Sequence, residues 1–461
     1  MKGFKFIKNK YLDFWNLLFI FILIFYSFQH SYFSAIHFHE CDSSSIFEFM
    51  KDDSTNESMK SFIREVTPDF LLQFRLKISE LSQYIPFKPL KKFIQLPYLS
   101  TYPALMGLIY SKITISSYEA FYRIASFITG LALQISSLLL YITCIRFNYP
   151  KRVGFIISSL LLTFYGTNSY SYHLGSTIWY IFSISVGIFL LTFEKSFGKD
   201  LISSLMIFLS YPYMVWILSL FLVKTFYISF KKRINFNFFK KYLLPEVYRS
   251  FSVTIFPLLA NIILFFPFGV GKRGGPDLRA FYTIFSFEPS KSNLDIFAII
   301  FSIIIYFFVL KGIFKTYNFL QNKKYDLSNF NFINHNSKIK EDPNINKHKL
   351  NIYCITFIIT FITLVIFEKL TFSTSRHTLF IIPVFLILTT FALEEFQNNI
   401  KSLNILTIKN IGSPIIIVLI TLAFFTSYNA TLERVDPLKR TEIPESIHKF
   451  IKDSKGLNYS I

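Results

Sequence analysis

Charged residues are scarce in this sequence of 461 residues. Asp, Glu, Lys and Arg make up 16% of the chain, whereas a soluble domain usually carries about 25%. Hydrophobic residues account for 52%, and the mean hydropathy is +0.43. This shortage of charge argues against a soluble globular protein. Several apolar runs approach the roughly 20 residues that a membrane-spanning helix needs.

Cysteine is also rare, with three in the whole chain. Only Cys41 falls in a long segment that we expect outside the cytoplasm, so no external disulfide pair is available. The sequence has no Walker motif, no dinucleotide-binding fingerprint and no paired CxxC motif. Nucleotide chemistry and a zinc ribbon therefore find no support in the sequence.

The apolar runs predict an all-α polytopic membrane protein with about 11 transmembrane helices, each close to the length of a bilayer crossing. The first run follows four lysines and has no small-residue cleavage site after it, which predicts a retained signal anchor. The run 201–230 is too long for one helix, and Tyr211-Pro212-Tyr213 is expected to divide it. The expected spans are 14–36, 120–145, 153–171, 177–193, 201–212, 213–230, 251–268, 295–314, 351–367, 377–393 and 411–428.

These spans divide the chain into six parts, and the largest segment outside the membrane on the extracytoplasmic face is the first loop. Amphipathic and apolar stretches in that loop predict juxtamembrane helices. The parts are an N-terminal cytoplasmic segment with the first span (1–36), the first extracytoplasmic loop (37–119), membrane helices 2–8 (120–314), a disordered cytoplasmic loop (315–350), membrane helices 9–11 (351–428) and an extracytoplasmic tail (429–461).

The net charge of +20 raises the question of a nucleic-acid partner. With the N-terminus in the cytoplasm, most of this charge falls on segments that the topology places on the cytoplasmic side. Positive charge on that side is the usual signature of membrane orientation. We therefore expect membrane lipid as a partner and no nucleic acid.

An acidic segment follows the first span directly and reads His37-Phe38-His39-Glu40-Cys41-Asp42. Ionisable groups at a membrane face are costly unless they meet water, a partner or a substrate. A solvated loop start would explain a single acidic residue, but the pair beside two histidines favours a functional site. His39, Glu40 and Asp42 are also ligand types that suit a divalent metal, although side chains on one short segment cannot all converge on an ion without help, so the cofactor stays open.

Cationic candidates lie on the same side of the membrane. Arg123 stands one helical turn after Glu119 at the start of the second span, where a simple helix-start ion pair is the alternative. A glycine-rich loop carries Lys272 and Arg273, and such loops let backbone and cations approach a phosphate closely. A flexible loop would explain the same composition.

The remaining candidates lie at the extracytoplasmic ends of expected spans. Arg376 and His377 precede the tenth span, and a cation placed there against the positive-inside tendency favours an anionic ligand. His173 follows Tyr170-Ser171-Tyr172, where anchoring of the tyrosines at the membrane interface is the alternative explanation.

Taken in order, these residues resemble the GT-C superfamily of membrane glycosyltransferases, which includes protein O-mannosyltransferases and aminoarabinose transferases. The resemblance covers most of the chain at the level of topology. It rests on Glu40 and Asp42 after the first span, on Tyr102-Pro103-Ala104-Leu105 before the second, on Glu119 with Arg123, and on Arg376 with His377. The chain departs from the family in having Glu-Cys-Asp for an adjacent acidic pair and Tyr-Pro-Ala for a double proline.

The resemblance implies a polyprenyl-phosphate-linked sugar as donor, a lipid, glycan or protein as acceptor, and inversion at the anomeric carbon. One carboxylate suffices as general base, because the phosphate leaving group needs no general acid. We expect Asp42 in this role, with Glu40 as its rival or as a group that orients the acceptor. The expected substrate-binding residues are His37, His39, Tyr102, Arg123, His173, Lys272, Arg273, Arg376 and His377.

Other functions remain open on the sequence alone. They are a polysaccharide polymerase or ligase that uses polyprenyl-diphosphate glycans, a lipid or ion transporter, and a structural assembly factor. The compositional bias favours a bacterial inner membrane and a role in the cell envelope over the endoplasmic reticulum.

Overall fold

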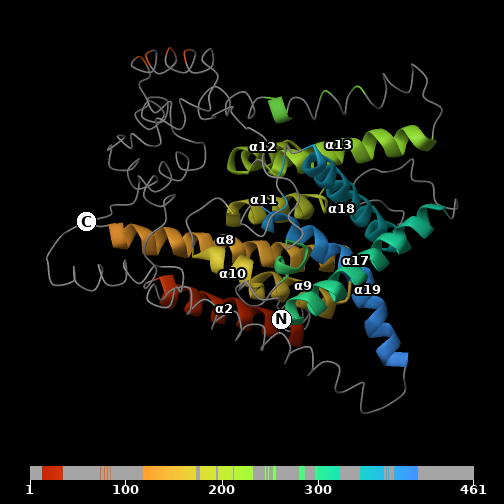
Figure 1. The fold of residues 1–461 in the computed structure, drawn as a ribbon, viewed down its shortest axis with the longest axis horizontal. Helices are drawn as coiled ribbons and strands as arrows, with labels where there is room; N and C mark the ends of the chain where they lie inside the picture. The colour runs from red at the N-terminus through yellow and green to blue at the C-terminus, as the bar shows by residue number, and fades with distance from the viewer. Residues whose placement is uncertain are drawn as a thin grey trace, which may run out of the picture.

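The computed structural model describes residues 13–34, 118–172, 177–193, 196–210, 212–231, 280–285, 296–321, 343–367 and 378–402, with a few single positions between them. Every regular element in these ranges is a helix (Figure 1). The all-α class expected from the composition is confirmed for this part of the chain. The helices are α2 (Phe14–Ser34), α8 (Tyr118–Arg146), α9 (Lys151–Thr163), α10 (Tyr165–Ser171), α11 (Thr177–Leu190), α12 (Phe197–Leu209), α13 (Pro212–Lys231), α16 (Ala280–Thr283), α17 (Ile296–Gln321), α18 (Pro343–Ile366), the 3₁₀ turn η4 (Leu379–Ile381) and α19 (Ile382–Ser402).

Five of these helical stretches are long and apolar enough to cross a membrane, as is typical of a multi-pass membrane protein. They are Phe14–Ser31, Arg123–Arg146, Ile299–Gln321, Asn344–Ile366 and Leu379–Asn399, and shorter apolar helices cover Thr177–Leu190 and Pro212–Val223. The spans expected at 251–268 and 411–428 lie almost entirely outside the described residues. The total of about 11 spans, which rests on bilayer thickness, stays a prediction.

Helix α17 shows how the apolar surface is divided between the core and the membrane. On one face Ile303 is 61%, Leu310 63% and Phe314 65% exposed. On the other face Ile305 and Val309 are buried in the core. A helix that is apolar all round and keeps large side chains exposed is suited to lipid contact.

Helix α2 packs against α8, and the two helices run in opposite directions. The Tyr141 hydroxyl, near the end of α8, donates a hydrogen bond to Asn16 at the start of α2. Further along, Ser27 donates to Gln134 over 2.8 Å. The end of α2 therefore lies beside the beginning of α8. On its other side α8 packs on α11, which lies between α8 and the α12–α13 pair (Figure 1).

The expected span 153–171 is wrong as a single helix, because the chain breaks at Phe164 into α9 and α10. Phe164 has an extended backbone with φ −60° and ψ 134°. The break frees carbonyl groups at the end of α9, which have no water to turn to inside a membrane. Thr167 donates to the Leu161 carbonyl over 2.5 Å, and the Asn168 amide donates to the Leu162 carbonyl over 3.3 Å. Polar side chains of α10 thus donate hydrogen bonds to carbonyl groups that the break leaves free at the end of α9.

The expected break in the run 201–230 is confirmed, with α12 ending at Leu209 and α13 beginning at Pro212. The Tyr213 hydroxyl reaches back to Ser203 over 3.1 Å. Ten residues of continuous helix would separate these positions by about 15 Å, so the chain turns sharply between them. Ser210, at the turn, accepts a 2.7 Å hydrogen bond from Ser183 of α11.

Helices α17 and α18 extend further than expected from the sequence. Residues 315–321 and 343–350, which we expected in a disordered loop, are helical; the residues between them lie outside the described part. The physical reason is that Lys315 and Lys347 form ion pairs with α19. Their charges therefore stabilise packed helix ends, although their composition suggested a solvated linker.

Gly312 lets α17 approach the backbone of α19. A Cβ atom at this position would overlap the carbonyl oxygen of Leu388. Gly198, in the first turn of α12, has no atom within 4 Å of the corresponding position. The two glycines therefore form a matched pair for testing this contact.

We expect Gly312→Ala to lower the unfolding temperature in detergent, because overpacking a close contact costs about 1–3 kcal/mol. Gly198→Ala should leave the unfolding temperature unchanged or raise it, since alanine is favoured over glycine in helices by about 1 kcal/mol. Equal unfolding temperatures for the two variants would contradict the close approach of α17 and α19.

Candidate functional site

Of the expected catalytic and substrate-binding residues, Arg123 alone falls within the described part of the chain. It is exposed in the second turn of α8, and the unbroken helix from Tyr118 puts Glu119 one turn before it on the same face. The other candidates, which lie outside the described residues, are His37, His39, Glu40, Asp42, Tyr102, His173, Lys272, Arg273, Arg376 and His377.

The described residues that flank several of these candidates nevertheless meet. His30 lies one turn before the end of α2, which leads to the acidic segment 37–42. Its imidazole Nε2 is 3.0 Å from the carbonyl oxygen of Ser171, the last residue of α10. Two residues after Ser171 the chain reaches His173. The exits of α2 and α10 are therefore joined directly.

The imidazole of His30 is held on several sides. It is fully buried and stacks on the ring of Tyr172, with 4.3 Å between centroids and 4° between planes. Gly130 of α8 lies against it, since a Cβ atom there would come within 2.6 Å of the ring. The position of the His30 side chain and the spacing between α2 and α8 therefore depend on each other.

Hydrogen bonds extend this cluster along α10 and α8. Tyr26 donates to the Ser171 hydroxyl over 2.9 Å, and that hydroxyl donates to the Asn168 carbonyl over 2.5 Å. Ser126 of α8 donates to the Tyr172 carbonyl over 3.3 Å. We call these residues, together with His30, the outer cluster: Tyr26, His30, Ser126, Ser171 and Tyr172.

The start of η4 also lies against α10. A Cβ atom at Gly166 would meet the Leu379 side chain at 2.8 Å. Leu379 comes two residues after His377 and three after Arg376 in the sequence. The segment before α19 therefore approaches the same short helix that ends in the outer cluster.

The described residues contain no group of three His, Cys, Asp or Glu side chains that could hold a metal ion. The segment with His39, Glu40 and Asp42 is not among them, so its capacity for a metal stays a prediction. What the outer cluster itself offers is hydrogen bonding by hydroxyl groups, backbone carbonyl oxygens and one imidazole, without a carboxylate.

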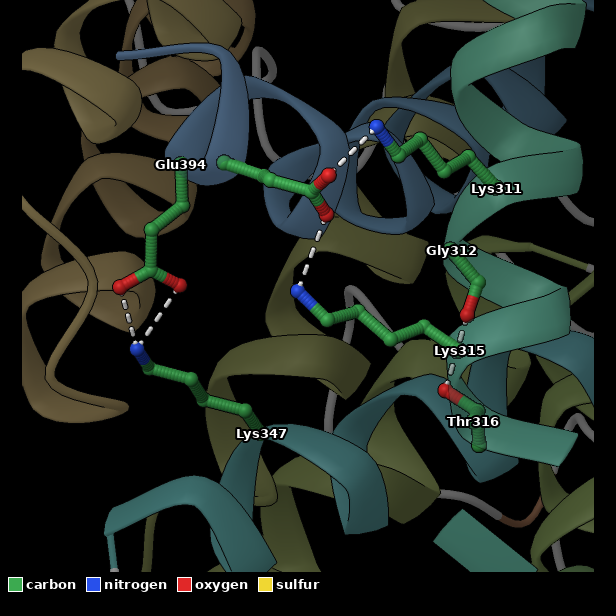
Figure 2. Close-up of polar contacts among 7 residues, drawn as sticks. Lys311, Gly312, Lys315, Thr316, Lys347 and Glu394 are labelled. Atoms are coloured by element: carbon green, nitrogen blue, oxygen red, sulfur yellow. Dashed lines mark hydrogen bonds and ion pairs between the residues drawn. The ribbon is translucent and has the colours of Figure 1, made fainter. Parts of the chain in front are cut away.

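Ion pairs join three other helices, α17, α18 and α19, near Tyr149, which lies beyond the end of α8 opposite to the outer cluster. Lys347 of α18 is buried and donates to both carboxylate oxygens of Glu394, over 2.6 and 2.9 Å (Figure 2). The neighbouring Glu395 accepts from Lys311 over 2.8 Å and from Lys315 over 3.2 Å. Two consecutive carboxylates of α19 thus bind lysines from two other helices.

Aromatic rings support the cations at this end. Lys347 lies over the ring of Tyr149, which joins α8 to α9, so the pairs of α19 and the ends of α8 and α9 belong to one region. Such contacts contribute about 0.5–2 kcal/mol each, depending on burial. The cation-to-centroid distances are 4.7 Å for Lys347 over Tyr149, 5.4 Å for Lys315 over Phe391, 5.3 Å for Arg152 over Trp15, and 5.3 and 4.4 Å for Arg146 over Phe189 and Phe193.

The start of α2 joins this charged end through Asp13. Lys151 donates to Asp13 over 2.8 Å, and this hydrogen bond holds the pKa of the Asp13 carboxyl below its usual value. Both side chains are about one-third exposed, so the pair contributes only about 0–1 kcal/mol. The charged end matches the side that the sequence assigns to the cytoplasm.

Sequence reasoning missed His30 and Lys347. The signal for His30 is an imidazole inside an otherwise apolar span, which marks a partnered or functional group in a membrane protein. The signal for Lys347 is weaker, because lysines are common in the surrounding polar segment. Only the ion pair with Glu394 on another helix distinguishes it.

Neither a protein-family model, nor a curated protein, nor a solved structure matches this chain. A functional proposal must therefore be built from the chain's own residues.

We expect Lys347→Met alone to lower the unfolding temperature in detergent strongly, because removing one partner of a buried pair costs about 3–5 kcal/mol. The double variant Lys347→Met with Glu394→Gln should recover much of this loss. Lys315→Met is the control, since Lys311 still neutralises Glu395 and an exposed pair contributes about 0–1 kcal/mol. If Lys347→Met and Lys315→Met unfold at the same temperature, the buried pair does not hold the helices together.

Proposed function

We propose that the protein is an integral membrane glycosyltransferase that moves a sugar from a polyprenyl phosphate to an acceptor hydroxyl at the extracytoplasmic face. The proposal includes about 11 spans, since the remaining apolar runs also have the length of a crossing. It takes the GT-C-like order of motifs in the sequence as its starting point.

One structural observation supports the proposal most. The outer cluster joins the exits of α2 and α10 and the beginning of α8, and the start of η4 packs on α10. Each of these ends leads, within a few residues, to a candidate from the sequence: the acidic segment, His173, Arg123, and Arg376 with His377. Carboxylates and cations entering from one set of helix ends are what a transfer from a phosphate donor requires.

The chemistry assigns complementary roles to the two kinds of residue. Asp42, or its rival Glu40, accepts the proton of the acceptor hydroxyl, whose oxygen then forms a bond to the anomeric carbon. The bond from that carbon to the phosphate oxygen breaks, and polyprenyl phosphate leaves with the electron pair. Attack from the opposite face inverts the anomeric centre.

Charge on the departing phosphate rises during this step. Preorganised cations at the leaving group stabilise such a transition state more than the ground state. The residues that we assign to this role are Arg123, Lys272, Arg273, Arg376 and His377, with His37, His39, Tyr102 and His173 completing the substrate site.

The test of this function is transfer from radiolabelled polyprenyl-phosphate sugars in membranes that contain Asp42→Asn or Glu40→Gln. Removing the carboxylate that acts as general base should reduce transfer by about 100-fold or more. Removing the other carboxylate should reduce transfer by a smaller factor. Asp53→Asn makes the same chemical change in the same loop and should leave transfer unchanged. Wild-type rates in both Asp42→Asn and Glu40→Gln, at normal expression, would overturn the catalytic assignment.

A further inference from the structure

We propose that His30 is a positioning residue of this extracytoplasmic site, which acts by fixing the exit of α10 and with it His173. The inference rests on the proposed function and names a residue that the motifs do not contain. It is carried by the contacts of one buried imidazole.

The chemistry of the contact fixes the state of the ring. The partner of Nε2 is the carbonyl oxygen of Ser171, which can only accept, so Nε2 carries the hydrogen and donates it over 3.0 Å. Ser171 ends α10, and the last carbonyl groups of a helix have no partner within it. Ser171 and His30 are both fully buried, so no water replaces that partner. His30 thus supplies from α2 the donor that the end of α10 needs.

Packing does not explain why this residue is a histidine. The second nitrogen, Nδ1, is buried and has no hydrogen-bond partner. Leaving a buried polar atom unpaired costs about 1–3 kcal/mol. A phenylalanine would keep the stack on Tyr172 without that cost, but it would not donate to Ser171.

The chain is short between the fixed carbonyl and the candidate residue. His173 comes two residues after Ser171, so it lies within about 7 Å of chain from that carbonyl. The intervening residue, Tyr172, is itself held by the imidazole stack and by Ser126. Displacing His30 therefore displaces Ser171 and Tyr172, the last described residues before His173 in the sequence.

The experiment compares His30→Phe, which keeps the ring stack and loses the donor, with His30→Gln, which keeps a donor. Ser137→Ala is the matched control, because Ser137 donates a buried 2.7 Å hydrogen bond to the Ser158 carbonyl between α8 and α9. Hydrogen exchange of residues 170–176, measured by mass spectrometry on the full-length protein in detergent, reports the positioning without any substrate. Transfer kinetics with radiolabelled polyprenyl-phosphate sugar report its consequence.

We expect His30→Phe to speed hydrogen exchange in residues 170–176 and to lower kcat by about 10–100-fold with little change in KM, since a displacement of about 1 Å can cost about 100-fold. His30→Gln should restore part of both, and Ser137→Ala should change neither. In a His173→Ala background His30→Phe should cost little more, because the two residues act in series.

Unchanged exchange of residues 170–176 in His30→Phe would overturn the inference and leave the proposed function standing. Multiplicative losses in the double variant, with a lower unfolding temperature, would also overturn it by showing a purely structural role. Faster exchange in a protein whose wild type transfers no sugar would instead overturn the proposed function, while supporting the coupling of His30 to α10.

Discussion

The constraint on which the rest of the structure depends is that polar groups inside a membrane must find partners within the protein. At the break of the helix at Phe164, the side chains of Thr167 and Asn168 donate hydrogen bonds to carbonyl groups of α9. At the end of α10, the imidazole of His30 donates a hydrogen bond to the carbonyl of Ser171. These hydrogen bonds allow the chain to form α9 and the short helix α10 in place of one continuous span. The breaks are therefore held by hydrogen bonds and lead the chain to defined exits.

The same constraint separates the two ends of the helices. At one end, lysines that would be costly in an apolar environment are neutralised by Glu394 and Glu395 or lie over aromatic rings. At the other end, the outer cluster contains hydroxyl groups and an imidazole, and its bonds join α2, α8 and α10. The proposed function needs such a division, because the ion pairs anchor the helices at one end and the candidate residues follow the helix ends at the other.

In the described part of the chain the sequence predicts the helical class and the positions of most helices, because hydrophobic runs and spans share one cause, the thickness of the bilayer. Helix α19 (Ile382–Ser402) begins and ends later than the expected span 377–393. The sequence also predicts the break before Pro212, since proline cannot continue a helix. It does not predict the break at Phe164, where no proline stands, the nearest glycine (Gly166) lies within α10, and the hydrogen-bond partners come from residues further along. The extension of α18 to Pro343 was missed for a similar reason, because Lys347 looks like a loop residue until Glu394 is placed beside it. The roles of His30 and Gly130 likewise depend on contacts between helices.

The central claim is that the ion pairs of α17, α18 and α19 lie toward the cytoplasm and that the acidic segment, which follows α2 in the sequence, lies on the other side of the membrane. Cys41 lies within that segment, whereas Cys144 and Cys354 are buried and therefore inaccessible to a labelling reagent. The most direct test is labelling with a membrane-impermeant maleimide in right-side-out and inverted vesicles, followed by identification of the labelled cysteine. The account predicts that Cys41 is labelled in right-side-out vesicles. Labelling of Cys41 in inverted vesicles alone would contradict it.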